Sequence, residues 1–426
     1  MKNSNKLRVF EAFSGIGAQR KALERLGINH EVVAISEIDK FAIKSYEAVH
    51  GKTLNLGDIS KLKVEDIPDH DLFTYSFPCQ SVSISGLQRG FEEGSGTRSS
   101  LLWECKKVIE GKKPKYLLME NVKNLVSKKF KPTFDKWCKW LEEQGYTNYW
   151  QVLNAKDYGV PQNRERVFMI SILGVHEPYV FPEKQELHIR LKDVLDKEVD
   201  SKFYLKEDKV KQLLKNVDGK IDVNKKRLGT VHKNNDMTRS TRDIVFNDLF
   251  EAPCLTATMH KDAPKILESA DGIYLNASKR FQAGSLKDLS RTLKAEKHDA
   301  GVVLVNEPKV INPLKGKTEN GWHFEQNVYD DNGITRTIKA GGGSGNIPKV
   351  INNNEELPII RKLTPKECWR LMGFDDSDFE KAEQVNSNTQ LYKQAGNSIV
   401  VNCLEGIFYE LFKNTEYMEV ESEIVA

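Results

Sequence analysis

The sequence predicts an α/β protein with a Rossmann-like sheet and a second, smaller, β-rich domain. In the first half, short apolar runs alternate with amphipathic stretches, which is typical of βαβ units that build a parallel sheet. After Pro182 the sequence becomes Lys-rich, and then carries short strand patterns and Gly-rich turns. The length of 426 residues exceeds what one hydrophobic core usually supports, and favours two domains.

Five apolar runs predict the strands of the sheet. They span residues 7–13, 31–38, 71–77, 116–120 and 166–173. Amphipathic patterns predict helices over residues 18–26, which Gly27 terminates, and over residues 100–109. Helical periodicity returns at residues 394–412, and we expect this segment to pack back on the first domain. The expected domains are residues 1–187 with 385–426, and residues 188–384.

Composition argues against a membrane protein and a secreted protein. No apolar run approaches the ~18 residues that cross a bilayer, and the first residues lack the apolar segment of a secretory signal. Six dispersed cysteines form no Cys-x-x-Cys pair, which argues against disulfides and a structural metal. We therefore expect a cytoplasmic protein without a metal, in which only Cys79 has surroundings that indicate a reactive thiol.

A glycine-containing turn follows the first predicted strand. It reads Phe13-Ser14-Gly15-Ile16-Gly17, and Glu37 ends the next strand about 20 residues further on, which is nucleotide-binding geometry. Glycines let the backbone approach a ligand, and a carboxylate accepts hydrogen bonds from ribose hydroxyls. A dinucleotide site expects a third glycine where this chain has Arg20, which favours S-adenosyl-L-methionine over NAD. Asp58 is placed to accept a hydrogen bond from the adenine amino group.

Candidate catalytic residues follow later strands. Cys79, in Ser76-Phe77-Pro78-Cys79-Gln80, falls at the carboxyl edge where an open α/β sheet places its active site. The Ser- and Gly-rich stretch behind it has the composition of an active-site lid. Glu120 falls at the end of the neighbouring strand, and Arg164 and Arg166 come just before the last one. Together these groups suggest a site that activates an electrophile.

Six ordered blocks of this chain resemble those of the DNA (cytosine-5) methyltransferases of bacterial or phage restriction-modification type. They are Phe-x-Gly-x-Gly at Phe13, Pro-Cys-Gln at Pro78, Glu-Asn-Val at Glu120, Gln-x-Arg-x-Arg at Gln162, Arg361-Lys362-Leu363-Thr364 and Gln394-x-Gly396-Asn397-Ser398. The resemblance implies a Rossmann-like S-adenosylmethionine-dependent methyltransferase sheet, with the middle of the chain as a variable target-recognition domain. It departs from the family at Ile38, where some members have an aromatic residue that stacks on adenine.

The resemblance also implies a mechanism. The Cys79 thiolate adds to carbon 6 of a cytosine flipped out of duplex DNA, while Glu120 hydrogen-bonds ring nitrogen 3 and the exocyclic amine. Arg166 holds the carbonyl oxygen of the base, and Arg164 supports the catalytic loop and lowers the pKa of the thiol. Ser85 is the candidate to enter the vacated space in the duplex. Methylation at carbon 5 would protect DNA from a cognate restriction endonuclease that acts separately.

The expected contact residues form two sets, and we expect the protein to be a nucleoid-associated monomer that binds double-stranded DNA. The residues expected to line the cofactor pocket are Phe13, Ser14, Gly15, Ile16, Gly17, Glu37, Ile38, Asp58, Ile59, Pro78, Leu101, Asn397 and Ser398. The residues expected to contact DNA are Ser83, Ser85, Arg89, Thr256, Arg291, Arg336, Gly342 and Gly343. A weak internal repeat occurs at residues 254–257, 292–295 and 337–340; Thr256 lies in its first copy, and Arg291 and Arg336 directly precede the other two.

Three alternatives remain open at this point. A tRNA cytosine methyltransferase would share the fold, but such relatives keep the middle region small. A nucleotide-linked oxidoreductase would bind NAD, which the missing third glycine disfavours. A DNA-binding regulator descended from an enzyme would function without Cys79.

Overall fold

The chain divides into two compact units in this computed structural model. Described are residues 6–78, 82, 92–206, 208, 210–212, 221–222, 225, 227–231, 244–247, 250–255, 257, 265–267, 281–282 and 360–418. The first unit combines Met1–Ile189, Pro253–Lys261 and Pro365–Ala426, and the second combines Arg190–Ala252 and Asp262–Thr364. We expected the chain to return to the first domain at residue 385. The structure instead assigns residues 365–384 to the first unit as well.

The first unit is built on a six-stranded sheet. Its strands are β1 (Leu7–Ala12), β2 (His30–Ser36), β3 (Leu72–Tyr75), β4 (Tyr116–Val122), β5 (Tyr146–Asn154) and β6 (Glu165–Leu173), in the order β2-β1-β3-β4-β6-β5. β1 to β4 are parallel, whereas β6 runs antiparallel to both β4 and β5. The expectation of a parallel sheet is therefore wrong at this edge, and β5 was not predicted because its residues are mostly only half-buried.

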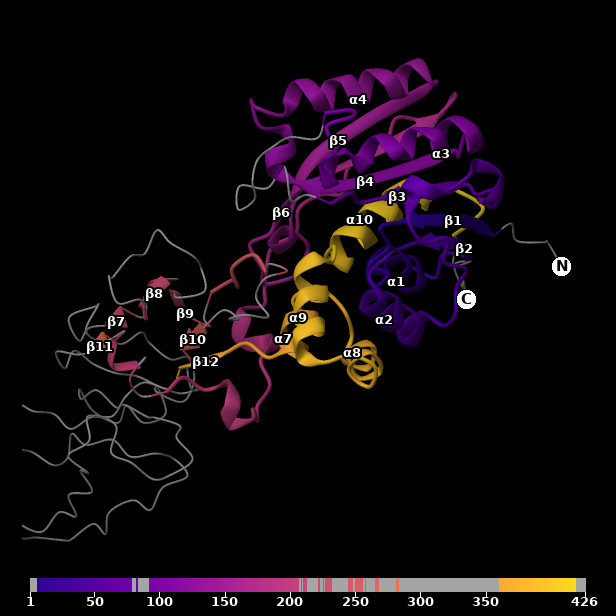
Figure 1. Cartoon of the computed structure of the whole chain (residues 1–426). Coiled ribbons are helices and arrows are strands. Elements are labelled where there is room, and N and C mark those ends of the chain that lie inside the picture. Colours follow the sequence, from indigo (N-terminus) through magenta and orange to yellow (C-terminus); the bar gives the residue numbers. More distant parts are fainter. Residues whose placement is uncertain are drawn as a thin grey trace, which may run out of the picture. The chain divides into compact units, whose positions relative to one another are not determined.

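Helices cover both faces of this sheet (Figure 1). On one face lie α3 (Cys105–Lys112) and α4 (Lys131–Glu143), which enclose a core that includes Phe10, Phe73 and Trp137. On the other lie α1 (Ala18–Arg25), α2 (Lys40–His50) and α10 (Val401–Phe412). The predicted helix at residues 100–109 is a 3-10 helix, Arg98–Glu104, followed by α3. The predicted helix at 394–412 is broken into α9 (Asn388–Asn397) and α10.

The second unit is small and rich in strands in its described part. β8 (Arg227–Thr230), β9 (Ile244–Asn247), β10 (Lys265–Leu267) and β12 (Ile360–Lys362) form one sheet in the order β12-β10-β9-β8. β7 (Ile221–Asp222) pairs with β11 (Phe281–Gln282). Buried apolar side chains of Leu228, Val245 and Ile360 belong to its core. The expectation of a Rossmann-like sheet with a second, β-rich domain is confirmed.

Two short helices at the C-terminal side explain where the first unit resumes. α7 (Pro365–Arg370) packs on α9, where Trp369 donates a hydrogen bond from Nε1 to the carbonyl oxygen of Leu391. α8 (Asp376–Glu383) is tied to α1 by Lys21, whose Nζ lies 2.8 Å from an Asp378 carboxylate oxygen. These contacts place both helices in the first unit.

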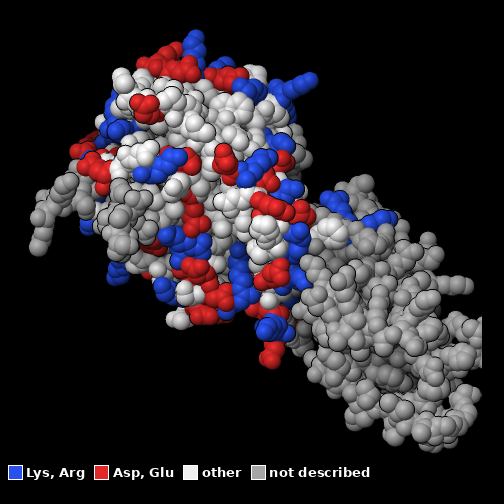
Figure 2. Space-filling view, turned by 180° about the vertical axis from the view of Figure 1, so that it is seen from behind, with Lys and Arg blue, Asp and Glu red and all other residues white. Residues whose placement is uncertain are grey.

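Charge is distributed without a strong bias over the face of the molecule seen in Figure 2. Lys and Arg alternate with Asp and Glu on its described part, and no large area there carries one sign. A one-signed basic surface is the usual electrostatic footprint of nucleic-acid binding, so this face does not qualify as one. None of the helices in the described ranges is long and apolar enough to span a membrane.

Candidate active site

A cavity of about 460 Å³ lies where β1, β2, β3 and β4 end. Its size is within the range typical of ligand pockets. Of the thirteen residues expected to line a cofactor pocket, twelve line this cavity, namely Phe13, Ser14, Gly15, Ile16, Glu37, Ile38, Asp58, Ile59, Pro78, Leu101, Asn397 and Ser398. Glu120, Arg164 and Arg166 line it too, so the candidate cofactor and catalytic groups share one space.

The two glycines of the turn after β1 have different reasons to be glycine. Both have positive φ, +57° at Gly15 and +80° at Gly17. A Cβ built on Gly15 meets nothing within 4 Å, whereas one on Gly17 would lie 2.6 Å from Nε2 of His50 and 2.8 Å from Cε2 of Tyr46. Gly17 is the one expected pocket residue that does not line the cavity, because its close approach is to α2 rather than to a ligand.

Glu37 holds the rim of the cavity together. One carboxylate oxygen accepts from the backbone N–H of Gly15 at 2.9 Å, and the other from those of Ile38 and Asp39 at 2.8 Å. A carboxylate accepts about four hydrogen bonds, so one acceptor position is left for a ligand. We expected Glu37 to accept from both ribose hydroxyls, and the structure leaves capacity for one.

Polar and apolar groups around the rim suit a nucleoside-like ligand. Asp58 accepts from the hydroxyl of Ser60 at 2.7 Å and from its N–H at 3.0 Å, and these bonds lower the pKa of the Asp58 carboxyl. Ser14 has a buried hydroxyl that finds no hydrogen-bond partner within the described residues. Ile38 is 72% exposed and presents an apolar side chain to the cavity.

Glu120 and Arg166 form the charged centre of the site. Nε of Arg166 lies 3.2 Å from a carboxylate oxygen of Glu120, because the antiparallel pairing of β4 and β6 sets them on adjoining strands. Glu120 is 8% exposed. Burial raises the pKa of its carboxyl, and the guanidinium groups of Arg166 and Arg164 offset only part of that rise.

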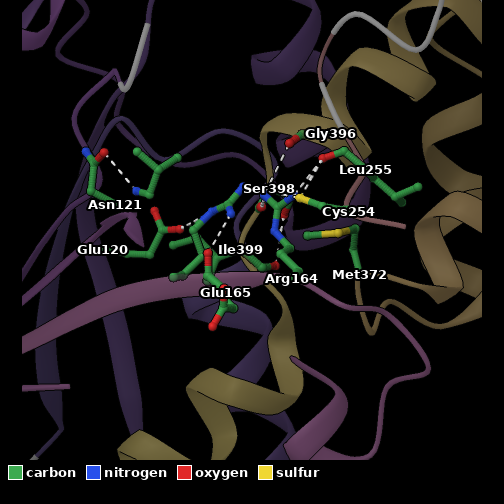
Figure 3. Close-up of polar contacts among 12 residues, drawn as sticks. Glu120, Asn121, Arg164, Glu165, Cys254, Leu255, Met372, Gly396, Ser398 and Ile399 are labelled. Atoms are coloured by element: carbon green, nitrogen blue, oxygen red, sulfur yellow. Dashed lines mark hydrogen bonds and ion pairs between the residues drawn. The ribbon is translucent and has the colours of Figure 1, made fainter. Parts of the chain in front are cut away.

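Arg164 acts as a buried clamp. Its guanidinium donates to the carbonyl oxygens of Leu255 at 2.8 Å, Ser398 at 2.6 Å and Gly396 at 3.2 Å (Figure 3). Gln162 reinforces this junction, since its side chain donates to Leu371 and accepts from the N–H of Leu255. The described contacts of Arg164 therefore join three distant stretches of the first unit. The loop that carries Cys79, which we expected Arg164 to support, lies outside the described residues.

Cys254 contacts two arginines that line the cavity, and sequence reasoning did not assign it a role there. Its sulfur lies 3.6 Å from a guanidinium nitrogen of Arg164 and 3.8 Å from one of Arg166. Burial raises the pKa of this thiol, but the two guanidinium groups outweigh burial and the net shift is downward. The expectation that only Cys79 has such surroundings is wrong for Cys254. No local motif marks it, because its partners are 88 and 90 residues away in the chain.

The chain is held on both sides of Cys79, the expected nucleophile, which itself lies outside the described residues. The hydroxyl of Ser99 donates to the carbonyl oxygen of Pro78 at 2.6 Å, and the amide of Asn121 donates to that of Phe77 at 2.9 Å. Asn124 donates to the carbonyl oxygen of Val82 at 2.6 Å. Sequence reasoning did not assign roles to Ser99, Asn121 or Asn124.

The expected DNA-contacting residues cannot be placed in the site. Ser83, Ser85, Arg89, Thr256, Arg291, Arg336, Gly342 and Gly343 all lie outside the described residues. Among the residues that the structure describes, no group of three or more His, Cys, Asp and Glu side chains is arranged to hold a metal ion.

Sequence comparisons give the family. The model of the C-5 cytosine-specific DNA methylases matches residues 7–413. Type II methyltransferase M2.ScrFI of Lactococcus lactis subsp. cremoris is 36% identical, over 96% of this chain and 99% of its own. Orphan methyltransferase M.SPRI of Bacillus phage SPR is 34% identical, over 98% and 100%. Type II methyltransferase M.HhaI of Haemophilus parahaemolyticus is 31% identical, over 95% and 94%.

Solved structures agree on the fold. The S. pombe Dnmt2 methyltransferase aligns with a TM-score of 0.58 at 19% identity, over 96% of this chain and 99% of its own. The Entamoeba histolytica methyltransferase EhMeth aligns with a TM-score of 0.60 at 16% identity, over 96% and 98%. From the family match and the near-complete coverage of its relatives, the chain belongs to the C-5 cytosine-specific DNA methylases and is a DNA (cytosine-5-)-methyltransferase.

Proposed function

We propose that this enzyme methylates carbon 5 of cytosine within a specific sequence of double-stranded DNA, by base flipping and covalent addition of Cys79 to carbon 6. The observation that carries the proposal is the pair of Glu120 and Arg166, 3.2 Å apart in the same cavity as the glycine turn. A pair of this kind can hold a pyrimidine by its polar edge. The remaining groups, Cys79 among them, belong to the sequence blocks that resemble those of the family.

S-adenosyl-L-methionine fits the cavity between the turn and Glu37. The unpartnered hydroxyl of Ser14 is a donor for a polar ligand group, and Glu37 has one acceptor position left for a ribose hydroxyl. Asp58 would accept from the adenine amino group, and Ile38 would pack on the ring. Leu101, Asn397 and Ser398 line the same cavity. When bound, this cofactor supplies a methyl group made electrophilic by a sulfonium.

Cys79 makes carbon 5 reactive. Carbon 5 of cytosine is a poor nucleophile, and addition of a thiolate to carbon 6 places an electron pair where a methyl acceptor needs it. The hydrogen bonds from Ser99 and Asn121 hold the carbonyls of Pro78 and Phe77, just ahead of Cys79 in the chain. Once carbon 5 has bonded to the methyl group, loss of its proton to solvent would restore the double bond between carbons 5 and 6 and expel the thiolate.

Glu120 and Arg166 stabilise the addition. Because burial raises the pKa of the Glu120 carboxyl, it can supply a proton to ring nitrogen 3 more readily than an exposed glutamate. Arg166 would hold the carbonyl oxygen of the base and keep Glu120 oriented. Arg164 would act on both groups indirectly. Its hydrogen bonds to the carbonyl oxygens of Leu255 and Ser398 fix the start of β6, the strand that carries Arg166.

The base must leave the duplex for these contacts to form. Flipping costs a few kcal/mol, which contacts from the loop after Cys79 and from the second unit would offset. Ser85 remains our candidate for the residue that fills the gap. Ser83, Arg89, Thr256, Arg291, Arg336, Gly342 and Gly343 remain the candidates for DNA contacts.

A transfer assay with labelled methyl groups on duplex DNA tests the mechanism. Cys79→Ala should abolish transfer, and Glu120→Gln should lower kcat by about 10² or more. Glu165→Gln is the matched control, because Glu165 lies on β6 with a 45% exposed side chain and pairs with Lys123. All three variants should keep cofactor affinity in calorimetry.

Covalent trapping gives the sharper criterion. Wild-type enzyme should form an adduct with duplex DNA that carries 5-fluorocytosine at the target, and Cys79→Ala should not. An enzyme that methylates normally without such an adduct would contradict the proposed mechanism. Transfer to tRNA and not to DNA would contradict the proposed substrate.

We also propose that methylation protects DNA from a cognate endonuclease, with the enzyme acting as a monomer. The names of the relatives, type II and orphan methyltransferases, support a role of this type but differ on whether an endonuclease accompanies it. Bisulfite sequencing of DNA from cells that express the chain would give the target sequence. Resistance of that DNA to an endonuclease of the same specificity would test protection.

A further inference from the structure

The Gly15-Ile16-Gly17 turn rests on two side chains that the proposed mechanism does not use. An added Cβ at Gly17 would lie 2.6 Å from Nε2 of His50 and 2.8 Å from Cε2 of Tyr46. The side chains of His50 and Tyr46 are fully buried, and both come from α2, which lies beside α1 (Figure 1). These two rings therefore form the floor of the turn.

Both ring nitrogens of His50 face oxygen acceptors. Nδ1 lies 3.1 Å from a carboxylate oxygen of Glu24, and Nε2 lies 3.3 Å from the carbonyl oxygen of Ile16. Burial raises the pKa of the Glu24 carboxyl, but hydrogen bonds and charge from His50 and Arg20 lower it further, so Glu24 is an acceptor only. The His50 ring therefore lies between an acidic side chain of α1 and the backbone of the turn.

The groups around His50 are ionisable on every side. From α1, Arg20 donates to the same Glu24 oxygen at 3.1 Å and to the carbonyl oxygen of His50 at 2.9 Å. From α2, the Tyr46 ring lies 5.0 Å from the His50 ring, and its hydroxyl donates to Glu11 of β1 at 2.8 Å. From β2, His30 is close enough for its pKa to respond to His50. Glu24 is the acidic group in contact with the His50 ring.

We propose that His50 is a positioning residue for the methyl donor. Its ring bridges the Glu24 carboxylate and the Ile16 carbonyl, and so holds the turn in its binding shape. The inference rests on the proposed cofactor pocket, in which Gly15 and Ile16 are lining residues. Loss of the bridging ring should therefore lower affinity for the cofactor.

The test is the dissociation constant of S-adenosylhomocysteine, measured by calorimetry. His50→Phe should bind roughly tenfold more weakly than wild type, because it keeps a ring of similar size but makes no hydrogen bond to Glu24 or Ile16. His50→Gln keeps a side-chain amide that can donate to one of the two oxygens, so it should recover part of the lost affinity. Such a partial rescue is not expected if His50 acts through packing alone.

Two further variants keep the result interpretable. His30→Gln is the matched control, since His30 bonds the carbonyl oxygen of Ile28 and this variant should bind the ligand as tightly as wild type does. Glu24→Gln removes the carboxylate that faces Nδ1 of His50 and should also weaken binding. Because the Glu24 side chain is 35% exposed, this variant carries the test if His50→Phe does not fold. Wild-type affinity in both His50→Phe and Glu24→Gln would overturn the inference.

Failure of the proposed pocket gives a different pattern. In that case, the wild-type enzyme would not bind S-adenosylhomocysteine, or Glu37→Ala would bind it as tightly as wild type does. Weakened binding in Glu37→Ala together with wild-type affinity in His50→Phe would instead support the pocket and refute only the role of His50.

Discussion

Two carboxyl groups of the first unit are buried in different surroundings. Glu120 lies 3.2 Å from the guanidinium of Arg166, which partly offsets the cost of burying its charge. Glu11, in the middle of β1, is fully buried and accepts a hydrogen bond from the hydroxyl of Tyr46. Burial raises the pKa of Glu11 to about 7, although Tyr46 and the charge of Arg20 lower it. Glu11 is thus a source of pH-dependent stability.

Replacing Glu11 by Gln should remove that dependence. In the wild type the folded-state pKa is raised from 4.5 to about 7. The contribution of Glu11 to stability is therefore full below about pH 4.5 and is lost as pH rises through about 7. Urea denaturation should show Glu11→Gln gaining about 2 kcal/mol relative to wild type between pH 5 and pH 8.

Glu47→Gln serves as the control, because Glu47 is an exposed residue of α2. It should keep the wild-type pH dependence. Equal pH dependence of Glu11→Gln and the wild type would show that Glu11 is already ionised in the folded protein.

At this scale, the residues that could be predicted are those that belong to blocks at strand ends. Glu37, Glu120 and Arg166 line one cavity, as their positions after predicted strands led us to expect. His50 and Cys254 were missed for a physical reason. Their roles depend on partners from other elements, such as Ile16 for His50 and Arg164 for Cys254, and no local pattern reports such contacts.

Among the elements, the parallel strands were the easiest to predict. β1 and β3 are almost wholly buried, so they appear in the sequence as continuous apolar runs. β5, at the edge of the sheet, consists mostly of half-buried and exposed residues. Its sequence therefore has no continuous apolar run that would predict a strand. The antiparallel direction of β6 could not be predicted either, since direction depends on connections and not on local composition.

The turn between β1 and α1 provides a prediction about one element. Gly17→Ala places a Cβ at φ +80° and 2.6 Å from the His50 ring, so it adds a steric conflict to backbone strain. We expect a loss of about 2 kcal/mol of stability or more, and cofactor binding weakened by roughly tenfold or more. Thermal unfolding and calorimetry measure the two effects.

Gly27→Ala separates the two causes. Gly27 ends the same helix at φ +64°, and an added Cβ there meets nothing within 4 Å. This variant should lose about 1 kcal/mol through backbone conformation alone and keep its cofactor affinity. Equal losses in both variants would mean that the His50 ring moves aside without cost.

For the whole chain, the first unit is completed by segments far apart in sequence. Arg164 and Gln162 bind residues 255 and 371, so the block between β5 and β6 fixes both the excursion Pro253–Lys261 and the C-terminal segment. The Lys-rich composition after Pro182 predicted that a second domain begins there. It could not predict that the chain returns at residues 253 and 365, because those returns are defined by such long-range contacts.

The ion pairs between α1 and α8 test how the C-terminal segment is held. Lys21 has a 13% exposed side chain and lies 2.8 Å from carboxylate oxygens of both Asp375 and Asp378. Asp375 also pairs with Arg25, whereas Asp378 has a side chain only 3% exposed and would be left as a buried carboxylate without its lysine. Lys21→Met should therefore cost about 3 kcal/mol in urea denaturation.

A second substitution identifies the cause of that loss. Lys21→Met combined with Asp378→Asn should recover at least half of it, because the uncompensated charge is gone while the shape is kept. Lys184→Met is the surface control, since Lys184 is 70% exposed beside Asp157 and should change stability by less than about 0.5 kcal/mol. If the double variant were no more stable than Lys21→Met, the loss would come from packing of the lysine side chain. The buried carboxylate of Asp378 would then not need a cation to hold α8 on α1.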